Sequence, residues 1–221
     1  MKNNECLVVI TKYPEIGNVK TRLGEEIGME NASQLNRMMI KDVVKANLNR
    51  GYDLAVESND INHEQSLKTL IGNDIQVGSR LSKFLRGPSS KTFEIYGYYL
   101  NNYAKVVMVF SDVPGVDSNV VDSAFIKLDK SEVVVGPDTS GGYYLLGMRK
   151  AYDLFTCLPE IRCPYLDFTL TEIRKKRIGV EIVETLQDID RVEDIMKIDW
   201  NNVGKVWKNT FDFICRLGIN H

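Results

Sequence analysis

The sequence predicts an α/β fold with a mainly parallel central sheet, and three observations carry that prediction. Short apolar runs rich in β-branched residues recur along the 221-residue chain, most clearly at residues 6–11 and 105–112. Segments with apolar residues at helical spacing lie between them, which implies crossover units and helices on both faces of the sheet. No repeat or low-complexity linker divides the chain. We therefore expect one domain over residues 1–221, with a C-terminal helical extension from about residue 199.

The first half of the chain alternates strands and helices. Residues 6–11 form a short β-rich run bounded by turn residues, typical of a buried strand. A helix is expected after the basic segment 12–24, with Asn31 as N-cap and Gly51 as terminator. Further elements are expected, in order, as a strand at 52–58, a weak helix at 64–71 and a short strand near 74–78.

The second half repeats the alternation. A helix over 79–85 is expected to break at 86–92 and to resume over 93–104, before the most strand-like run in the chain at 105–112. The remaining expected elements are a helix at 119–128, strands at 131–138 and 141–148, a helix at 168–177, a strand at 179–185 and an amphipathic helix at about 203–217.

Composition excludes several classes of protein. The formal net charge is −2, whereas a general nucleic-acid binder carries a strong basic excess. No apolar run approaches the roughly 20 residues of a membrane-spanning helix, and the N-terminus lacks a signal-peptide cleavage pattern. The four cysteines are scattered without a CxxC pair, which favours reduced thiols in a cytoplasmic protein.

Familiar catalytic motifs are also missing from the sequence. His63 and His221 are the two histidines, so a His-rich zinc site or a His-based triad has little to build on. There is no GxxxxGK[ST] and no GxGxxG, the main signatures of P-loop NTPases and dinucleotide-binding dehydrogenases.

Four expected strands end in unusual sequence. In open α/β sheets, ligands bind in the crevice at the carboxyl ends of the strands. The segments at these ends are a basic one at 12–24, two acidic ones at 111–115 and 187–194, and a glycine-rich one at 136–142. This mixture suits a phosphorylated ligand held with a divalent cation, because Mg²⁺ is usually bound by one or two carboxylates plus substrate phosphates.

Individual residues in these segments have expected roles. Asp112, directly after the strongest strand, is the best single metal-ligand candidate, and its carboxylate is expected to point into the crevice. Lys12, Lys20 and Arg22 would neutralise phosphate, with Arg offering a bidentate fork. Gly17 would let the segment bend as a flexible loop, on which Lys20 and Arg22 are solvated before the ligand arrives.

Each segment also has a simpler structural interpretation. A Lys/Arg loop is often just solvated surface, Asp-Val-Pro-Gly makes a good turn, and acidic residues suit a helix N-terminus. The joint placement of all four segments at strand ends favours the functional interpretation.

The motif K-x-P-x-x-G-x-V-K-T-R-L over 12–23, followed by G-G-Y-Y-L-L-G over 141–147, gives the chain a family resemblance. It resembles the DUF2064 family of glycosyltransferase-A-like proteins, distant relatives of molybdenum-cofactor and phospholactate guanylyltransferases. The resemblance extends from about Leu7 to Ile198. It implies a three-layer αβα, Rossmann-like nucleotide-diphospho-sugar transferase (GT-A) fold.

The resemblance also implies roles at the site. The metal, Mg²⁺ or Mn²⁺, would be held by Asp112 and Asp190, with Asp188 a weaker candidate. Lys12, Gly17, Lys20 and Arg22 would contact the nucleotide phosphates, and the acceptor side would be lined by Ser140, Gly141, Gly142 and Tyr143. Lys20, Asp112 and Asp138 would be catalytic, with Lys20 stabilising a transferring phosphoryl group and Asp138 offering the base that an inverting glycosyl transfer needs.

The sequence departs from the family pattern at several positions. Ser140 stands where an acidic residue usually precedes Gly-Gly-Tyr, and Asp138 lies two positions early. Phe110 and Gln76 replace a glycine and an acidic residue of the pattern, and residues 86–92 look like an insertion. The expected function is a metal-dependent transferase acting on a nucleotide sugar or nucleotide donor and a small-molecule acceptor. The alternatives are a guanylyltransferase-type nucleotidyltransferase and a catalytically degenerate nucleotide-binding protein.

Overall fold

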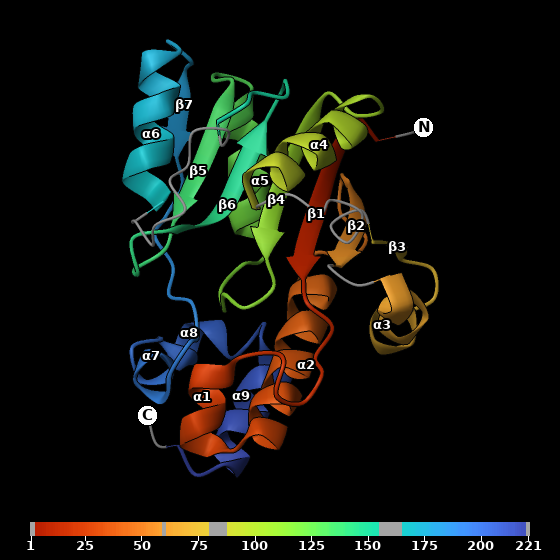
Figure 1. Cartoon of the computed structure of the whole chain (residues 1–221), viewed down its shortest axis with the longest axis vertical. Helices are drawn as coiled ribbons and strands as arrows, with labels where there is room; N and C mark the ends of the chain where they lie inside the picture. The colour runs from red at the N-terminus through yellow and green to blue at the C-terminus, as the bar shows by residue number, and fades with distance from the viewer. Residues whose placement is uncertain (1–2, 59–60, 80–87, 155–164, 220–221) are drawn as a thin grey trace.

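The computed structural model describes residues 3–58, 61–79, 88–154 and 165–219. Within these ranges seven strands form one sheet in the order β3-β2-β1-β4-β6-β5-β7 (Figure 1). The strands are β1 (Glu5–Thr11), β2 (Asp53–Ser58), β3 (Gln76–Gly78), β4 (Lys105–Phe110), β5 (Val133–Pro137), β6 (Tyr143–Met148) and β7 (Val180–Ile182). The helices are α1 (Thr21–Ile27), α2 (Met29–Ala46), α3 (Glu64–Ile71) with the 3₁₀ turn η1 (Ile61–His63), α4 (Pro88–Leu100), α5 (Ser118–Leu128), α6 (Tyr165–Lys175), α7 (Val192–Met196), α8 (Trp200–Val203) and α9 (Lys208–Arg216).

The sheet is mainly parallel, as predicted. Strands β1 to β4 pair in parallel, and so do β5 and β7, whereas β6 runs antiparallel to both β4 and β5. The carboxyl ends of β1, β4 and β5 therefore meet at one edge of the sheet, and β6 begins at that same edge. This single reversal brings the glycine-rich segment before β6 next to the ends of the parallel strands.

Helices cover both faces of the sheet, which confirms the three-layer αβα architecture. Side chains alternate along a strand, so Leu7 and Val9 of β1 pack in one fully buried cluster with α2 and α5. Cys6 and Val8 pack on the opposite face in a second cluster with α4 and α6. None of the helices in the described ranges is long and apolar enough to cross a membrane.

Several helix boundaries differ from the sequence-based expectation. Helix α2 begins after Gly28 and not at Asn31, because Gly28 has a φ of 90° that ends α1, while the Asn31 amide donates back to the Ile27 carbonyl. It ends at Ala46, with Asn47 as its C-cap, well before Gly51. Helix α4 begins at Pro88 and not at residue 93, as suits a proline in the first helical turn. The helix expected at 79–85 lies almost wholly outside the described residues.

The C-terminal helices pack on α2 through a buried carboxylate. Asp42 of α2 is fully buried, and its oxygens accept hydrogen bonds from the Thr210 backbone N–H at 2.7 Å and the Asn209 amide at 2.6 Å. Trp207 and Ile214 are fully buried in the same apolar cluster as β1. Figure 1 shows α1, α7, α8 and α9 gathered below the sheet, at the carboxyl ends of the strands. Those helices therefore face the edge where ligands bind in this class of fold.

Asp42→Ala is expected to lower the free energy of unfolding by about 1–3 kcal/mol, because it leaves buried donors of α9 without an acceptor. Urea unfolding followed by circular dichroism measures the change. Asp212→Ala removes a half-exposed carboxylate of the same helix that pairs only with Lys208 among the described contacts, so its effect should stay below about 1 kcal/mol. Equal losses for both variants would contradict the structural role of Asp42.

Candidate active site at the carboxyl edge of the sheet

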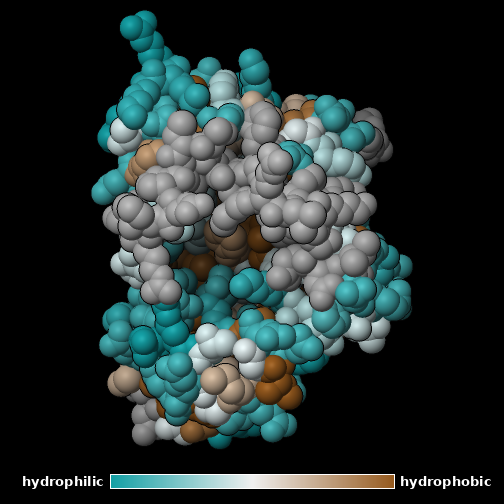
Figure 2. Space-filling view, viewed as in Figure 1, coloured by the Kyte–Doolittle hydropathy of each residue, from teal (hydrophilic) through white to brown (hydrophobic). Residues whose placement is uncertain are grey.

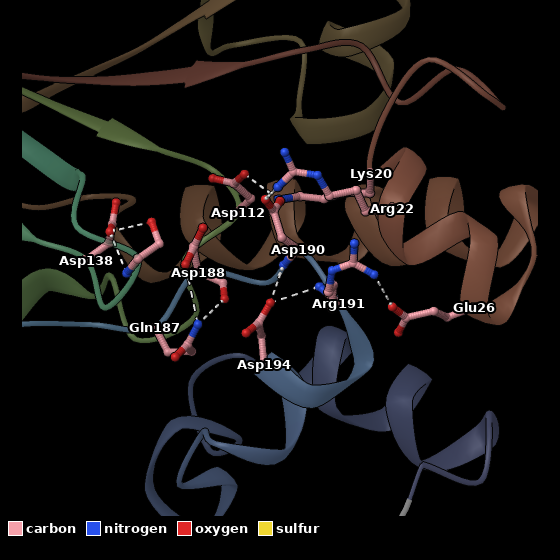
Figure 3. Close-up of polar contacts among 11 residues, drawn as sticks. Lys20, Arg22, Glu26, Asp112, Asp138, Gln187, Asp188, Asp190, Arg191 and Asp194 are labelled. Carbon is pink, nitrogen blue, oxygen red and sulfur yellow. Dashed lines mark hydrogen bonds and ion pairs between the residues drawn. The ribbon is translucent and has the colours of Figure 1, made fainter. Parts of the chain in front are cut away.

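Lys20 lies at the centre of the site. It is the residue directly before α1, and its Nζ lies 2.6 Å from Asp112 Oδ2 and 3.0 Å from Asp190 Oδ1 (Figure 3). The Lys20 side chain is only 7% exposed, so the expectation that it is solvated in the free protein is wrong. The buried side chains of Val19 and Leu23 on either side anchor the backbone here, and Lys20 lies between carboxylates that the sequence does not place near it.

The two carboxylates keep this buried lysine charged. Burial by itself would lower the pKa of Lys20, but Asp112 and Asp190 outweigh it and raise the pKa above its usual value. For Asp190, burial raises the pKa, but Lys20 and Arg22 lower it by more, so the net shift is downward. Lys20 is therefore an ammonium ion at neutral pH, held between the side chains of Asp112 and Asp190.

Asp112 is positioned by contacts at the end of β4. The Ser111 hydroxyl donates to Thr11 Oγ1 at 2.8 Å and links the ends of β4 and β1. The Ile189 backbone N–H donates to the Asp112 carbonyl at 3.2 Å, which joins this turn to the segment after β7. The carboxylate is 34% exposed and turned toward Lys20 (Figure 3), so it points away from the buried core.

The segment that carries Asp190 is fixed from both sides. Asp194 Oδ2 accepts the backbone N–H groups of Asp190 at 3.1 Å and Arg191 at 2.9 Å. Glu26 of α1 pairs with Arg191 at 2.9 Å and accepts the Val192 N–H at 2.8 Å. The contact between Glu26 and Arg191 is not predicted from the sequence, because no local pattern indicates a pair of residues 165 positions apart.

Asp188 adds further negative charge to the site. It is half-buried, and burial together with the neighbouring Asp138 and Asp190 raises its pKa to about 6. Lys20 acts in the opposite direction and does not compensate. The site therefore holds more carboxylate charge than its own cations neutralise.

Asp138 shapes the turn between β5 and β6. Its Oδ1 accepts hydrogen bonds from Ser140 N at 2.9 Å, Ser140 Oγ at 2.7 Å and Gly142 N at 2.7 Å. A Cβ on Gly142 would lie 2.5 Å from Asp138 Oδ2, and Gly141 has a φ of 92°, so the turn favours glycine at both positions. Tyr143 is the first residue of β6. The Ser140 hydroxyl thus binds within its own turn and does not replace a carboxylate facing the crevice.

The rest of the basic loop is anchored near β1 and exposed at its tip. The Tyr13 ring stacks on His63 with centroids 4.0 Å apart, and the Pro14 carbonyl accepts the Ser33 hydroxyl at 2.7 Å. Lys12 and Gly17 are exposed, and Gly17 has a φ of 80° that suits only glycine.

Arg22, in the first turn of α1, is 53% exposed and lies 3.1 Å from Asp190 Oδ2. The structure thus gathers Lys20, Arg22, Asp112 and Asp190, while Lys12 and Gly17 lie on the exposed part of the loop. At this edge Phe110, the last residue of β4, has a 42% exposed side chain. Figure 2 shows a hollow near the middle of the molecule, with hydrophilic side chains along its lower side.

The carboxylates at this edge can be compared with what the expected Mg²⁺ or Mn²⁺ requires. No group of three or more His, Cys, Asp or Glu side chains among the described residues is arranged to hold a metal ion. Asp112 and Asp190, however, already share one cation, the Lys20 ammonium. Two carboxylates completed by substrate phosphate oxygens are the usual protein share of a Mg²⁺ site. The residues fit a metal that arrives with a phosphorylated ligand, not a metal enclosed by protein ligands.

Asp188→Asn is expected to stabilise the metal-free protein at pH 7.5 by about 1–2 kcal/mol, because it removes a carboxyl whose pKa is raised to about 6 and whose charge solvent partly screens. A carboxyl whose pKa is raised on folding binds its proton more tightly in the folded state, so stability falls as the pH rises from about 4 through 6. Asparagine escapes that loss, and the gain should shrink toward zero at pH 4. Urea unfolding in EDTA at both pH values measures it; an equal gain at both would contradict the electrostatic origin.

Three known proteins illustrate what the chain is similar to. It is 25% identical over 220 residues to the 2-phospho-L-lactate guanylyltransferase of Methanocaldococcus jannaschii, covering 96% of this chain and 89% of that one. A putative nucleotide-diphospho-sugar transferase from Desulfovibrio desulfuricans G20 superposes with a TM-score of 0.83 at 23% identity, over 97% of this chain and 98% of the other. The 4-diphosphocytidyl-2C-methyl-D-erythritol synthase of Anaerococcus prevotii DSM 20548 gives a TM-score of 0.56 at 11% identity, over 88% and 96%.

The two structural likenesses support the same three-layer fold. The family described as "Uncharacterized protein conserved in bacteria (DUF2064)" matches residues 48–161. That match includes Asp112 and the turn at Asp138, and it is more than half of the 221 residues. The chain belongs to this family.

Proposed function

We propose that this protein is a metal-dependent nucleotidyltransferase, which transfers a nucleoside monophosphate from a nucleoside triphosphate to the phosphate of a small acceptor. The observation that carries the proposal is the Lys20 ammonium held between Asp112 and Asp190 at the carboxyl edge of the sheet. A buried cation beside paired carboxylates, at the place where α/β sheets bind ligands, suits a polyphosphate that brings its own counterion.

The reaction is an in-line displacement at phosphorus. An oxygen of the acceptor phosphate forms a bond to the α-phosphorus, the bond from that phosphorus to the bridging oxygen breaks, and pyrophosphate leaves with the electron pair. Lys20 and Arg22 stabilise the negative charge that develops on the phosphates, and Lys12 attracts the polyphosphate from the exposed part of the loop. Mg²⁺ or Mn²⁺, held by Asp112 and Asp190, would supply further charge neutralisation on the phosphate oxygens.

The turn at Asp138 favours nucleotidyl over glycosyl transfer. An inverting glycosyl transfer needs a base beside the acceptor, and Asp138 was the nearby candidate. Its Oδ1 accepts three hydrogen bonds from its own turn. An acceptor phosphate, in contrast, is already an anionic nucleophile and needs no protein base. The likeness to a guanylyltransferase over nearly the whole chain supports the same choice and makes GTP the first donor to test.

Transfer from a nucleotide sugar is the second candidate. The likeness to the Desulfovibrio protein, at a TM-score of 0.83, supports it. The two reactions differ in their products, because nucleotidyl transfer releases pyrophosphate and glycosyl transfer releases a nucleoside diphosphate.

We expect pyrophosphate release when the protein is incubated with GTP, Mg²⁺ or Mn²⁺ and a panel of small phosphorylated acids. Anion-exchange chromatography of the nucleotides and an enzyme-coupled pyrophosphate assay identify the products, with ATP, CTP, UTP and a nucleotide-sugar panel run in parallel. Nucleoside diphosphate from a nucleotide sugar would favour the second candidate. Nucleotide binding without any product across both panels would instead indicate a catalytically degenerate binding protein.

Asp112→Asn should lower the rate by at least about a hundredfold, because it removes a charge from the reacting centre while preserving shape. Glu181→Gln serves as the matched control for a removed negative charge: Glu181 pairs with Lys127 at 3.3 Å near the start of β5, at the opposite edge of the sheet. Its rate should be unchanged. Equal rates for Asp112→Asn and the wild type would remove Asp112 from the mechanism.

Arg22→Ala is expected to weaken GTP binding by about tenfold and to flatten its dependence on salt, because one charge-assisted contact to phosphate is lost. Isothermal titration across a salt series, without divalent cations, measures both quantities. Glu15→Ala, at the exposed tip of the same loop, controls for changes in the loop itself. An unchanged affinity and salt slope would mean that Arg22 is only a solvated surface residue.

A further inference from the structure

We propose that Lys20 is a tethered counterion: in the ligand-free protein its ammonium occupies the place of the divalent cation between Asp112 and Asp190, and it transfers to the phosphates when the nucleotide binds. This inference rests on the proposed function, because it assigns the metal and the phosphates to the same edge of the sheet. It concerns how the site is regulated, and it predicts that metal alone binds poorly.

The first support is the geometry of the two ion pairs. Lys20 Nζ contacts one oxygen of each carboxylate, at 2.6 and 3.0 Å, as a shared metal ion would. The Lys20 side chain is 7% exposed, whereas those of Asp112 and Asp190 are 34% and 42% exposed, so the ammonium is enclosed while the carboxylates stay open to an incoming cation. A divalent cation that enters between Asp112 and Asp190 must therefore displace the ammonium or share its ligands.

The second support is the bonding capacity left on Lys20. An ammonium has three N–H donors, and Lys20 Nζ donates to two acceptors among the described contacts. Lys105, at the other end of β4, makes a useful comparison, because its Nζ has a third acceptor in the Phe125 carbonyl besides Glu5 and Asp129. Lys20 therefore retains a donor for an incoming phosphate oxygen, whereas Lys105 is fully engaged.

The third support is the backbone of Lys20. Its φ of 47° and ψ of 45° are left-handed, a conformation that residues other than glycine rarely adopt. Such strain persists where surrounding contacts hold it in place, and it gathers at sites that switch. Here the two ion pairs and the buried Val19 hold it. Exchanging carboxylates for phosphate removes two of those restraints and lets the backbone relax toward the exposed part of the loop.

This arrangement couples the two ligands. A polyphosphate that draws Lys20 away frees Asp112 and Asp190 for the metal, and a metal that displaces Lys20 frees its charge for the polyphosphate. By linkage, each ligand raises the affinity of the other by the same factor. The coupling adds to the direct contact between metal and phosphate, and it excludes stray divalent cations from the site before substrate arrives.

The test measures Mn²⁺ alone binding to the full chain, by the electron paramagnetic resonance signal of free Mn²⁺ at about 0.1 M salt. Lys20→Met should bind Mn²⁺ at least about fivefold more tightly than the wild type, the lower end of typical coupling between sites. Lys127→Met carries the same change in net charge at the opposite edge and should differ from the wild type less than twofold. Lys20→Gln, which keeps a hydrogen-bond donor, serves the same purpose if the methionine variant does not fold.

Pyrophosphate binding in EDTA gives the second readout, and Lys20→Met should weaken it by at least about fivefold. Opposite shifts, tighter Mn²⁺ and weaker pyrophosphate, support the inference. Unchanged or weaker Mn²⁺ binding in the folded variant overturns it, and so does a gain of equal size in Lys127→Met. The proposed function is judged separately by the products that wild-type protein forms from GTP, so either conclusion can fail without the other.

Discussion

The ion pairs of Lys20 are the interaction on which the rest of the site depends. They join three segments that lie far apart in the sequence: the loop after β1, the turn after β4 and the segment after β7. Burying an ammonium is unfavourable unless it is paired, and removing either partner leaves an uncompensated charge. The edge of the sheet is therefore organised around the need to keep Lys20 paired, and a phosphate is the natural alternative partner.

The strands and the helix α1 around these ion pairs position the segments of the site. Parallel strands bring Thr11 and Ser111 together, and their hydroxyl contact fixes the start of the turn that carries Asp112. Strand β5 ends at this edge and the reversed strand β6 begins there. Gly141 and Gly142 belong to the turn between them and therefore lie at the same edge. Helix α1, tied to α7 through Glu26, forms the facing wall.

Stability and function oppose each other at this edge. Asp188 sits among other carboxylates and has its pKa raised to about 6, so its charge at neutral pH lowers the stability of the folded protein. Gly142 and Asp138, in contrast, stabilise the turn that they form. Their close contact holds the local backbone and leaves no space for a side chain on Gly142. An excess of negative charge is unfavourable in the free protein but suits a site that receives a cation with its substrate.

The sequence by itself determined the fold class and the segments of the site. Short apolar runs rich in β-branched residues, with helical spacing between them, placed most strands and helices. The rule that ligands bind at strand ends identified 12–24, 111–115, 136–142 and 187–194 as neighbours. Those signals are local, so they can be recognised without the tertiary structure. The tertiary structure alone decided that Lys20 is buried between Asp112 and Asp190, that β6 runs antiparallel, and that Asp42 holds α9 on α2. The contacts of Lys20 and of Asp42 span 90 or more residues, and the charged residues that make them look locally like ordinary surface charge. The direction of β6 depends on its pairing with β4, as between Val106 and Met148.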